Sequence, residues 1–397
     1  MNRRAFLSNS FAALGGTQCL SLLPNTLLGL GAGEETEHRT LVIIELKGGN
    51  DGLNTVVPFG DDEYYRARKR VRIESSELHK IDDYRGLHPK LAGMARRYGK
   101  GDVAILQGVG HPQPNRSHFK SREIWHTADL RGRAGSDGWL GRLCDQAYAE
   151  STLPELSVHI GKEIPYSLHS SVHAPVVFNT PDTYRWLGDK SADAALREKD
   201  STNKKRTTLE RLRGVMADAK SSSSRILAAI RNYETDVEYP KNDSAQAMRT
   251  AGALIGSGLG SRILSVRFGG FDTHASQPYD HGNALGIFDS SLDAFMKDIR
   301  STHAGKNTLV LVTSEFGRRV RENGSGGTDH GKAGVAFAIG EPVRGGLYGE
   351  YPSLKSLDEG DLRHNLDFRS IYASAIQWMG GDSETVLGGN FKPTPFV

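Results

Sequence analysis

Acidic and histidine side chains stand close together in two short, glycine-flanked stretches of the sequence. "GGFDTH" places Asp272 and His274 two residues apart, and "GSGGTDHG" places Asp329 beside His330. A carboxylate and an imidazole form a common pair of ligands for zinc or manganese. The same residue types also suit exposed polar loops, so this pattern alone leaves a metal site and an ordinary loop as alternatives.

Two more carboxylates follow apolar runs that are typical of buried strands. Asp51 lies in "KGGNDGLNT", where the glycines allow a sharp bend that leaves the carboxylate free to face a ligand. The alternative for Asp51 is a turn residue that satisfies neighbouring backbone N–H groups. Glu315 closes the apolar run of "NTLVLVTSEFGRRV", and we expect its carboxylate to face a ligand as well.

A serine stands where a helix is expected to begin. Ser117 lies in "HPQPNRSHF", and serine is a preferred N-cap residue. The functional alternative is a hydroxyl nucleophile, because the backbone N–H groups and the dipole at a helix N-terminus stabilise an anionic substrate. Arg116 and His118 flank Ser117 with side chains suited to binding phosphate or sulfate, or to proton transfer.

Taken together, these residue types are suited to metal-assisted cleavage of an ester. That reaction needs a hydroxyl nucleophile among carboxylates and imidazoles, since a metal lowers the pKa of the hydroxyl group and neutralises the leaving group. After removal of a leader that contains Cys19, Cys144 is the only cysteine left. Any metal must therefore be held by His, Asp, Glu and hydroxyl groups.

Five short apolar runs must position these residues, and helix-forming stretches alternate with them. The runs are residues 41–46 and 103–109 and the apolar parts of "SRILSVRFGG", "NTLVLVT" and "AGVAFAIG". The alternation predicts an α/β fold with a largely parallel central sheet flanked by helices. Ligands bind beyond the carboxyl ends of the strands in such sheets, and a strand that continued through "GGFDTH" would turn Asp272 and His274 to the same side.

The first residues indicate an export signal. "MNRRAFLSNSFAALGG" has two arginines before Phe6 and Leu7, and an apolar stretch and small residues follow, as in a twin-arginine leader at residues 1–33. A general secretory signal or a membrane anchor is the alternative. We expect export by the twin-arginine translocase, a periplasmic or extracellular location and no membrane association after cleavage.

Residues 34–397 are expected to form a single domain of ordinary globular composition. The full chain of 397 residues is 37% hydrophobic and 24% charged, with a formal net charge of +3. This small charge gives no support for nucleic-acid binding. Residues 190–257 are charged, rich in serine and helix-forming, and we expect them to form a helical insertion that caps the domain or packs on one side.

Several motifs resemble the exported family known as domain of unknown function 1501. They are "ELKGGNDGLNTVVPFGDDEYYRAR", "NRSHFKSREIWHT", "GGFDTH", "SEFGRRVRENGSGGTDHG" and "GGLYGEYPSL". That family is similar to the superfamily of alkaline phosphatases, sulfatases and cofactor-independent phosphoglycerate mutases. The resemblance implies an alkaline-phosphatase-like fold and a divalent metal, whether zinc, manganese, magnesium or calcium. The motif that matures to formylglycine in many sulfatases is missing, so a sulfatase of that type is not expected.

The resemblance implies a role for each matching position. Asp272, His274 and His330 correspond to the ligands of one metal site, and His281 is an alternative ligand because the superfamily usually spaces this Asp and His more widely. Ser117 corresponds to the nucleophile that opens a helix.

A weaker second metal site is implied, with Asp51 and Glu315 as its ligands. In the superfamily the strand before it ends in Asp-His-Gly, whereas this chain has Glu315, Phe316 and Gly317. Phenylalanine cannot bind a metal, so this second site would lack one ligand unless Asn50, Asp329 or another residue supplies it.

The sequence therefore favours an exported, metal-dependent hydrolase of phosphate or sulfate esters acting on a small-molecule or polysaccharide substrate. Ser117 is the expected nucleophile or anion contact, and Arg318 is expected to supply positive charge in place of the missing ligand. The alternative is an envelope binding protein that keeps the fold without the activity.

Overall fold

The computed structural model describes residues 38–131, 137–184 and 208–397, without the side chains of residues 208–212 and 215. The chain divides into two units, residues 1–38 and residues 39–397. The expected leader at residues 1–33 and the first part of the expected insertion, residues 190–207, lie outside the described residues. All that follows concerns the second unit.

A mixed sheet forms the centre of this unit. Among the described residues it has nine strands in the order β11-β5-β10-β9-β1-β8-β6-β7, with β12 paired to β5. Only β10 runs antiparallel to its neighbours, β5 and β9. The strands are β1 (Thr40–Leu46), β5 (Val103–Gly110), β6 (Ser157–Ile160), β7 (Val176–Phe178), β8 (Ile263–Phe268), β9 (Thr308–Thr313), β10 (Gly334–Ile339), β11 (Gly346–Tyr348) and β12 (Leu366–Asp367). The predicted α/β class with a largely parallel sheet is confirmed.

Both faces of the sheet are buried, which explains the continuous apolar character of its central strands. Along β1, Val42 and Ile44 belong to one core cluster, whereas Leu41 and Ile43 belong to the other. Side chains alternate between the faces of a strand, so β1 contributes to both cores. Full burial of a side chain of this size contributes about 1.5–3 kcal/mol.

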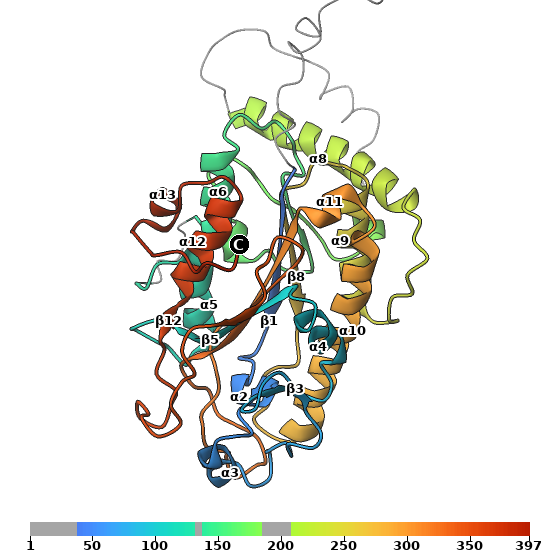
Figure 1. The fold of residues 1–397 in the computed structure, drawn as a ribbon. Helices are drawn as coiled ribbons and strands as arrows, with labels where there is room; N and C mark the ends of the chain where they lie inside the picture. The colour runs from blue at the N-terminus through green and yellow to red at the C-terminus, as the bar shows by residue number, and fades with distance from the viewer. Residues whose placement is uncertain (1–37, 132–136, 185–207) are drawn as a thin grey trace, which may run out of the picture. The chain divides into compact units, whose positions relative to one another are not determined.

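Helices cover each face of the sheet, as Figure 1 shows. One face packs against α4, α9 and α10, and the other packs against α5, α6 and α12. The bounds of these helices, and of the C-terminal helix α13, are α4 (Ala92–Tyr98), α5 (His118–Thr127), α6 (Trp139–Ala147), α9 (Asp243–Gly256), α10 (Gln277–Ile299), α12 (Phe368–Trp378) and α13 (Ser383–Leu387). The sheet is thus the middle layer of three.

Part of the segment expected as an insertion contributes to this core. Helix α9 places Met248, Ala251 and Leu254 in the core cluster that also holds Leu264, Val266 and Phe268 of β8. Helix α8 (Thr208–Arg231) packs against α9 and contributes the buried Ile226 to the same cluster.

A small second sheet and several short helices complete the unit. These elements are α2 (Gly52–Thr55), β2 (Val56–Val57), α3 (Asp62–Ala67), β3 (His79–Lys80), β4 (Gly86–Leu87), the 3₁₀ helices η1 (Tyr166–Leu168) and η2 (Pro181–Thr183), and α11 (His303–Lys306). Leu53 of α2, Val57 of β2 and Tyr64 of α3 belong to an apolar cluster that is separate from the two cores of the main sheet.

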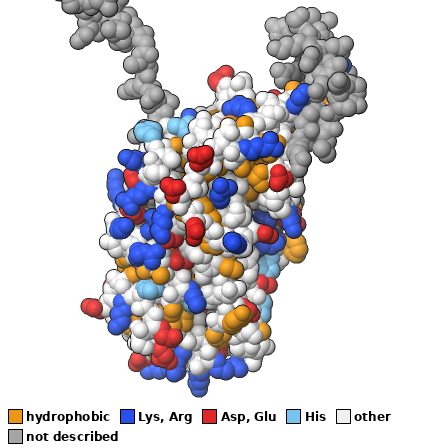
Figure 2. Space-filling model, turned by 90° about the vertical axis from the view of Figure 1, so that its right-hand side faces the viewer, with side chains coloured by type: hydrophobic (Ala, Val, Ile, Leu, Met, Phe, Trp, Pro, Cys, Tyr) orange, Lys and Arg blue, Asp and Glu red, His pale blue; other side chains and the backbone are white. Residues whose placement is uncertain are grey.

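The surface seen in Figure 2 carries acidic and basic side chains that are interspersed. Nowhere in the described ranges is there a helix with both the length and the apolar character that crossing a membrane requires. Cys144 is a free, buried thiol in α6, and burial raises its pKa to about 12.

Candidate metal centre

The carboxyl edge of the sheet brings together loops that are far apart in the sequence. The loops after β1, β8 and β9 meet there because these three strands are parallel neighbours. Helix α5 begins at the same edge, shortly after β5. The antiparallel direction of β10 puts its amino end at this edge too, so His330, which precedes β10, reaches the same place.

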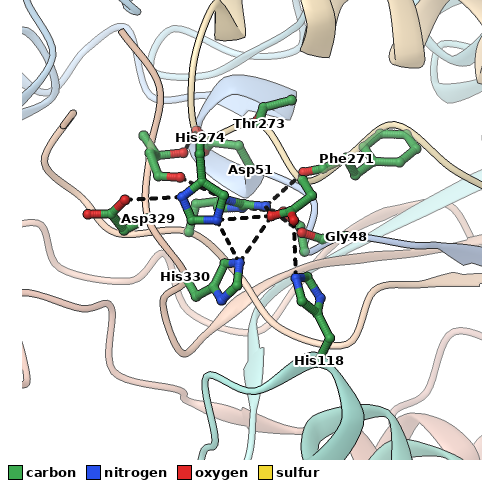
Figure 3. A network of polar contacts seen from close by, with 12 residues as sticks. Gly48, Asp51, His118, Phe271, Thr273, His274, Asp329 and His330 are labelled. Carbon is green, nitrogen blue, oxygen red and sulfur yellow. Dashed lines mark hydrogen bonds and ion pairs between the residues drawn. The ribbon is translucent and has the colours of Figure 1, made fainter. Parts of the chain in front are cut away.

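Three ligand atoms converge at the centre of this edge (Figure 3). The Oδ1 atom of Asp272 lies 3.1 Å from Nε2 of His274 and 3.0 Å from Nε2 of His330, and the two imidazole nitrogens are 2.8 Å apart. Atoms bound to one zinc ion at about 2.0–2.2 Å lie roughly 3 Å from one another. The triangle therefore has the size of one face of a metal coordination shell.

The hydrogen bonds made by Nδ1 of His274 and of His330 determine whether Nε2 of each ring carries a proton or a lone pair. Nδ1 of His330 lies 2.8 Å from the carbonyl oxygen of Arg116, and Nδ1 of His274 lies 3.2 Å from a carboxylate oxygen of Asp329. A carbonyl or a carboxylate can only accept, so each Nδ1 donates. In a neutral imidazole the lone pair is then on Nε2, so the two lone pairs face each other and need a proton or a cation between them.

His118 approaches the same carboxylate from α5. Its Nε2 atom lies 3.3 Å from Oδ2 of Asp272, and its Nδ1 atom lies 2.9 Å from Oε1 of Glu315. Ligand atoms of His118, Asp272 and His330 all lie within 4.8 Å of one another. The hydrogen bond to Glu315, assisted by both carboxylate charges, raises the pKa of His118 in spite of its partial burial.

Arg318 is fully buried beneath this group and ties three loops together. Its guanidinium donates to Oδ1 of Asp272 at 2.7 Å and to the carbonyl oxygens of Gly49 at 2.7 Å, Phe271 at 3.0 Å and Thr328 at 2.7 Å. Burial would raise the pKa of Asp272, but the hydrogen bond and the charge of Arg318, together with the contact to His330, outweigh burial and lower the pKa to about 2. Asp272 is therefore a carboxylate at neutral pH.

Glu315 is held by the glycine-rich loop after β1. Its carboxylate accepts from the backbone N–H of Gly48 at 2.9 Å and of Gly49 at 3.2 Å, besides its contact with His118. Both glycines have positive φ, +125° and +80°. A Cβ atom on Gly48 would lie 2.4 Å from the backbone nitrogen of Asp272, so only glycine allows the loop to approach this closely.

Phe316 lies under the histidines, in place of the ligand that the resemblance implied. Its ring centroid is 4.6 Å from that of His330 and 5.0 Å from that of His118. It also contacts the loop at Gly49, where a Cβ atom would lie 2.2 Å from the ring. The phenyl ring thus supports both imidazoles by packing and leaves their nitrogens to other partners.

Asp51 is fully buried, and protein groups occupy both of its carboxylate oxygens. Oδ1 accepts from the first backbone N–H groups of α2, and Oδ2 accepts from Arg68 at 2.7 Å and from Gln277 at 2.6 Å. The prediction that Asp51 binds a metal would require these partners to be exchanged. The turn interpretation describes what the carboxylate does in this structure.

His281 is buried in α10 and contacts the amide oxygen of Asn50 at 2.9 Å. Burial lowers its pKa to about 4. It packs edge-to-face against His88 and Phe271, so its ring is part of the packing around the loop after β1.

Ser117 and Arg116 lie at the start of α5. Ser117 occupies the N-cap position, as expected for a helix start, but its hydroxyl group makes no capping hydrogen bond, and the residue is exposed. It lines a cleft on the outer side of α5. The Arg116 guanidinium pairs with the buried Asp361, while its carbonyl oxygen receives the hydrogen bond from His330.

Of the residues expected from the sequence, Asp272, His274, His330, His118 and Glu315 meet at this centre. Asp51 and His281 contact other groups instead, and three polar partners of the expected residues had no signal in the sequence. Arg68, Gln277 and Asn323 hold Asp51 and Asp329, and the Asn323 side chain donates to Asp329 at 3.0 Å. None of these partners lies in a stretch whose composition indicates a site. His274 and Asp272 converge although β8 ends at Phe268, so the loop and not a continuing strand turns them together.

The fold and this centre define an α/β protein with a histidine and carboxylate cluster at the carboxyl edge of its sheet. The profile of the family described as "Protein of unknown function (DUF1501)" matches residues 108–391. The chain therefore belongs to the DUF1501 family. No curated protein matches the chain.

Solved structures of low sequence identity are similar in fold. A protein of the alkaline phosphatase superfamily from Vibrio parahaemolyticus is 9% identical with a TM-score of 0.42, over 89% of this chain and 69% of that one. The zinc complex of the C-terminal periplasmic domain of EcEptC from Escherichia coli is 10% identical with a TM-score of 0.37, over 76% and 72%. A putative sulfatase from Bacteroides thetaiotaomicron is 12% identical with a TM-score of 0.39, over 90% and 76%.

Proposed function

We propose that this chain is an exported, metal-dependent hydrolase of phosphate or sulfate esters. One observation carries the proposal: Asp272, His274 and His330 direct three ligand atoms at one point, while the outer nitrogen of each imidazole is occupied by an acceptor. This is the arrangement in which histidines hold a metal, with an outer partner that orients the ring and makes the inner nitrogen more basic.

The donor set fits one divalent cation. Two imidazole nitrogens and one carboxylate oxygen suit zinc or manganese better than calcium, which prefers oxygen ligands only. A cation bound there would bind a non-bridging oxygen of the ester and stabilise the negative charge that develops during cleavage. Asp51 and Glu315 are engaged by Arg68 and by the amides of Gly48 and Gly49, and we propose a single cation in place of two.

The neighbouring side chains have roles that follow from their contacts. His118, held by Glu315, would pass a proton to or from an oxygen of the substrate. Ser117 precedes it at the N-terminus of α5 and is the proposed nucleophile. Arg318 would keep Asp272 ionised and oriented instead of touching substrate, because its other donors are occupied by backbone carbonyl groups.

A binding protein without activity is the second candidate. It is favoured because protein groups already occupy the carboxylates of Asp51 and Glu315. This centre therefore has fewer free ligands for catalysis than a site that binds two metals. Under this alternative the centre would hold an anion through a bound cation without turnover.

The deciding experiment combines metal analysis with turnover. Purified mature protein is expected to contain about one divalent metal per chain and to cleave aryl phosphate or aryl sulfate. The variants His274→Ala and His330→Ala should lose both the metal and the activity. His303→Ala is the matched control, because His303 is exposed on α11, which precedes β9 and so lies at the opposite edge of the sheet.

The outcomes separate the candidates. Metal-free protein that stays inactive after reconstitution would overturn the hydrolase, and metal-containing protein without turnover would support the binding protein. Loss of turnover in Ser117→Ala, with metal retained, supports Ser117 as the nucleophile. Retained turnover in that variant would assign the attack to water.

A further inference from the structure

A cleft lies beside α5, and the residues of the candidate metal centre do not line it. Its volume is about 760 Å³, and its walls are α5, the segment from Lys162 to Tyr166, and Arg267 of β8. A volume in this range suits an organic ligand of several rings. Ser117 belongs to the lining of this cleft.

The cleft gathers exposed apolar side chains. Phe119 is 82% exposed, Tyr166 is 51% exposed and Ile164 is 41% exposed, and all three line it. They are half of the six large apolar side chains that are exposed among the described residues. Single exposed apolar residues are ordinary, but a group of them in one concave site indicates a ligand.

Positive charge accompanies these rings. Lys120, Arg122, Lys162 and Arg267 line the cleft, against the acidic Glu123 and Glu163. Lys120 lies 3.2 Å from Glu123, and Arg267 pairs with the buried Glu45 at 3.0 Å.

Two of the cations make no ion pair with the described part of the protein, although Nε of Arg122 donates to the carbonyl oxygen of His118 at 3.2 Å. Across the described ranges, no carboxylate forms an ion pair with Arg122 or Lys162. The Arg122 guanidinium lies 5.6 Å from the centroid of the Phe119 ring, so one ring face and one cation form a joined surface. A ligand with an apolar ring and a negative charge would complement it.

Helix α5 connects this cleft to the metal centre. Its inner side directs His118 at Asp272 and Glu315, and the Ser121 hydroxyl donates to the Glu315 carbonyl oxygen. Its outer side presents Phe119 and Arg122 to the cleft. Ser117, at the start of the helix, lines the cleft and directly precedes His118 in the sequence.

We propose that this cleft binds the part of the substrate that is not hydrolysed, and that this part is a ring-bearing organic group with a negative charge of its own. Its role as a substrate site rests on the proposed hydrolase function. Binding of such a group to the cleft does not depend on that function and can be measured without turnover.

The test uses 1-anilinonaphthalene-8-sulfonate, a ring-bearing anion, titrated into the full chain in the presence of a chelator. We expect saturable fluorescence with one site per chain. Phe119→Ala and Lys162→Glu should each weaken binding roughly 2- to 10-fold, the range expected for one aromatic or charged contact. Tyr279→Ala is the matched control, since Tyr279 is an aromatic residue that is 76% exposed and lies outside the lining of the cleft.

Binding that does not saturate, or that Tyr279→Ala weakens as much as Phe119→Ala does, would overturn the proposal. A competition arm then uses 4-carboxyphenyl phosphate, whose ring carries a charge apart from the ester, and methyl phosphate. The proposal requires 4-carboxyphenyl phosphate to displace the probe at the lower concentration. If the protein turns over substrate but Phe119→Ala binds the probe as tightly as wild type does, the hydrolase function is supported and the ligand site in this cleft is rejected. If the protein binds the probe in the cleft but shows no turnover, the ligand site is supported and the hydrolase function is rejected.

Discussion

At the scale of single residues, the partners of the buried Asp51 carboxylate keep it ionised and make it part of a buried ion pair. Burial would raise its pKa, but the Arg68 guanidinium, with help from His281 and Gln277, outweighs burial and holds the pKa below its usual value. The ion pair has almost no exposed side-chain surface, at 0% for Arg68 and 1% for Asp51. Removing one partner of a buried pair leaves the other charge without compensation.

We predict that Asp51→Asn lowers the free energy of unfolding by about 3–5 kcal/mol at pH 7, measured by urea denaturation. Asp83→Asn changes an exposed aspartate and is expected to have little effect. The folded pKa of Asp51 is lowered, so its stabilising contribution is present above the unfolded value of about 3.9 and is lost as the pH falls through the folded pKa. The difference between wild type and variant should therefore be constant near neutral pH and shrink below about pH 4. A difference that grows on acidification would contradict this assignment.

The sequence identifies the residues of the centre better than it identifies their partners. Asp272, His274 and His330 carry a chemical signal in their types and glycine-rich surroundings. Arg68 and Gln277 carry none, because an arginine in one helical segment and a glutamine at the start of another resemble ordinary surface residues. Their role depends on distances in the folded chain, such as the 2.6 Å from Gln277 to Asp51.

At the scale of elements, strand direction decides which side chains meet. All five apolar runs are strands, since each is long and apolar enough to be recognised. The short strands β6, β7, β11 and β12 have two to four residues each, too few for a pattern. The antiparallel direction of β10 was not predictable from its apolar run, although it is what puts His330 at the carboxyl edge.

The contact between α4 and α10 allows a prediction at this scale. Helix α4 has no side-chain N-cap of its own, and Asp289 of α10 instead accepts from the backbone N–H groups of Gly93 and Met94, both at 2.8 Å. Asp289→Ala leaves two buried N–H groups without a partner, so we expect a loss of about 2–4 kcal/mol in thermal or urea unfolding. Asp280→Ala, in the exposed first turn of α10, is the control. Equal stability of the two variants would show that the hydrogen bonds from α4 to Asp289 do not contribute to the free energy of unfolding.

At the scale of the whole molecule, the candidate metal centre is built from loops that other contacts of the fold already hold in place. Arg318 donates to three of these loops, and both faces of the sheet behind them are covered by helices. The loops of the centre are therefore already held in place before any ligand binds.

We predict that removing the metal leaves the protein folded. Chelator-treated protein should keep its near-ultraviolet circular dichroism and a cooperative thermal transition, with the midpoint lowered by only several degrees, as loss of one bound ligand requires. His274→Ala should show the same small change and should not respond further to chelator. A non-cooperative transition after chelation would mean that the ion, and not Arg318, holds the loops together.

The buried guanidinium of Arg318 bears on whether the chain folds before or after it binds an ion. Because a permanent positive charge from the polypeptide already neutralises Asp272, folding does not have to wait for an ion. If the centre binds an ion as proposed, the polypeptide can reach its final shape first and take up the ion afterwards, as a separate step.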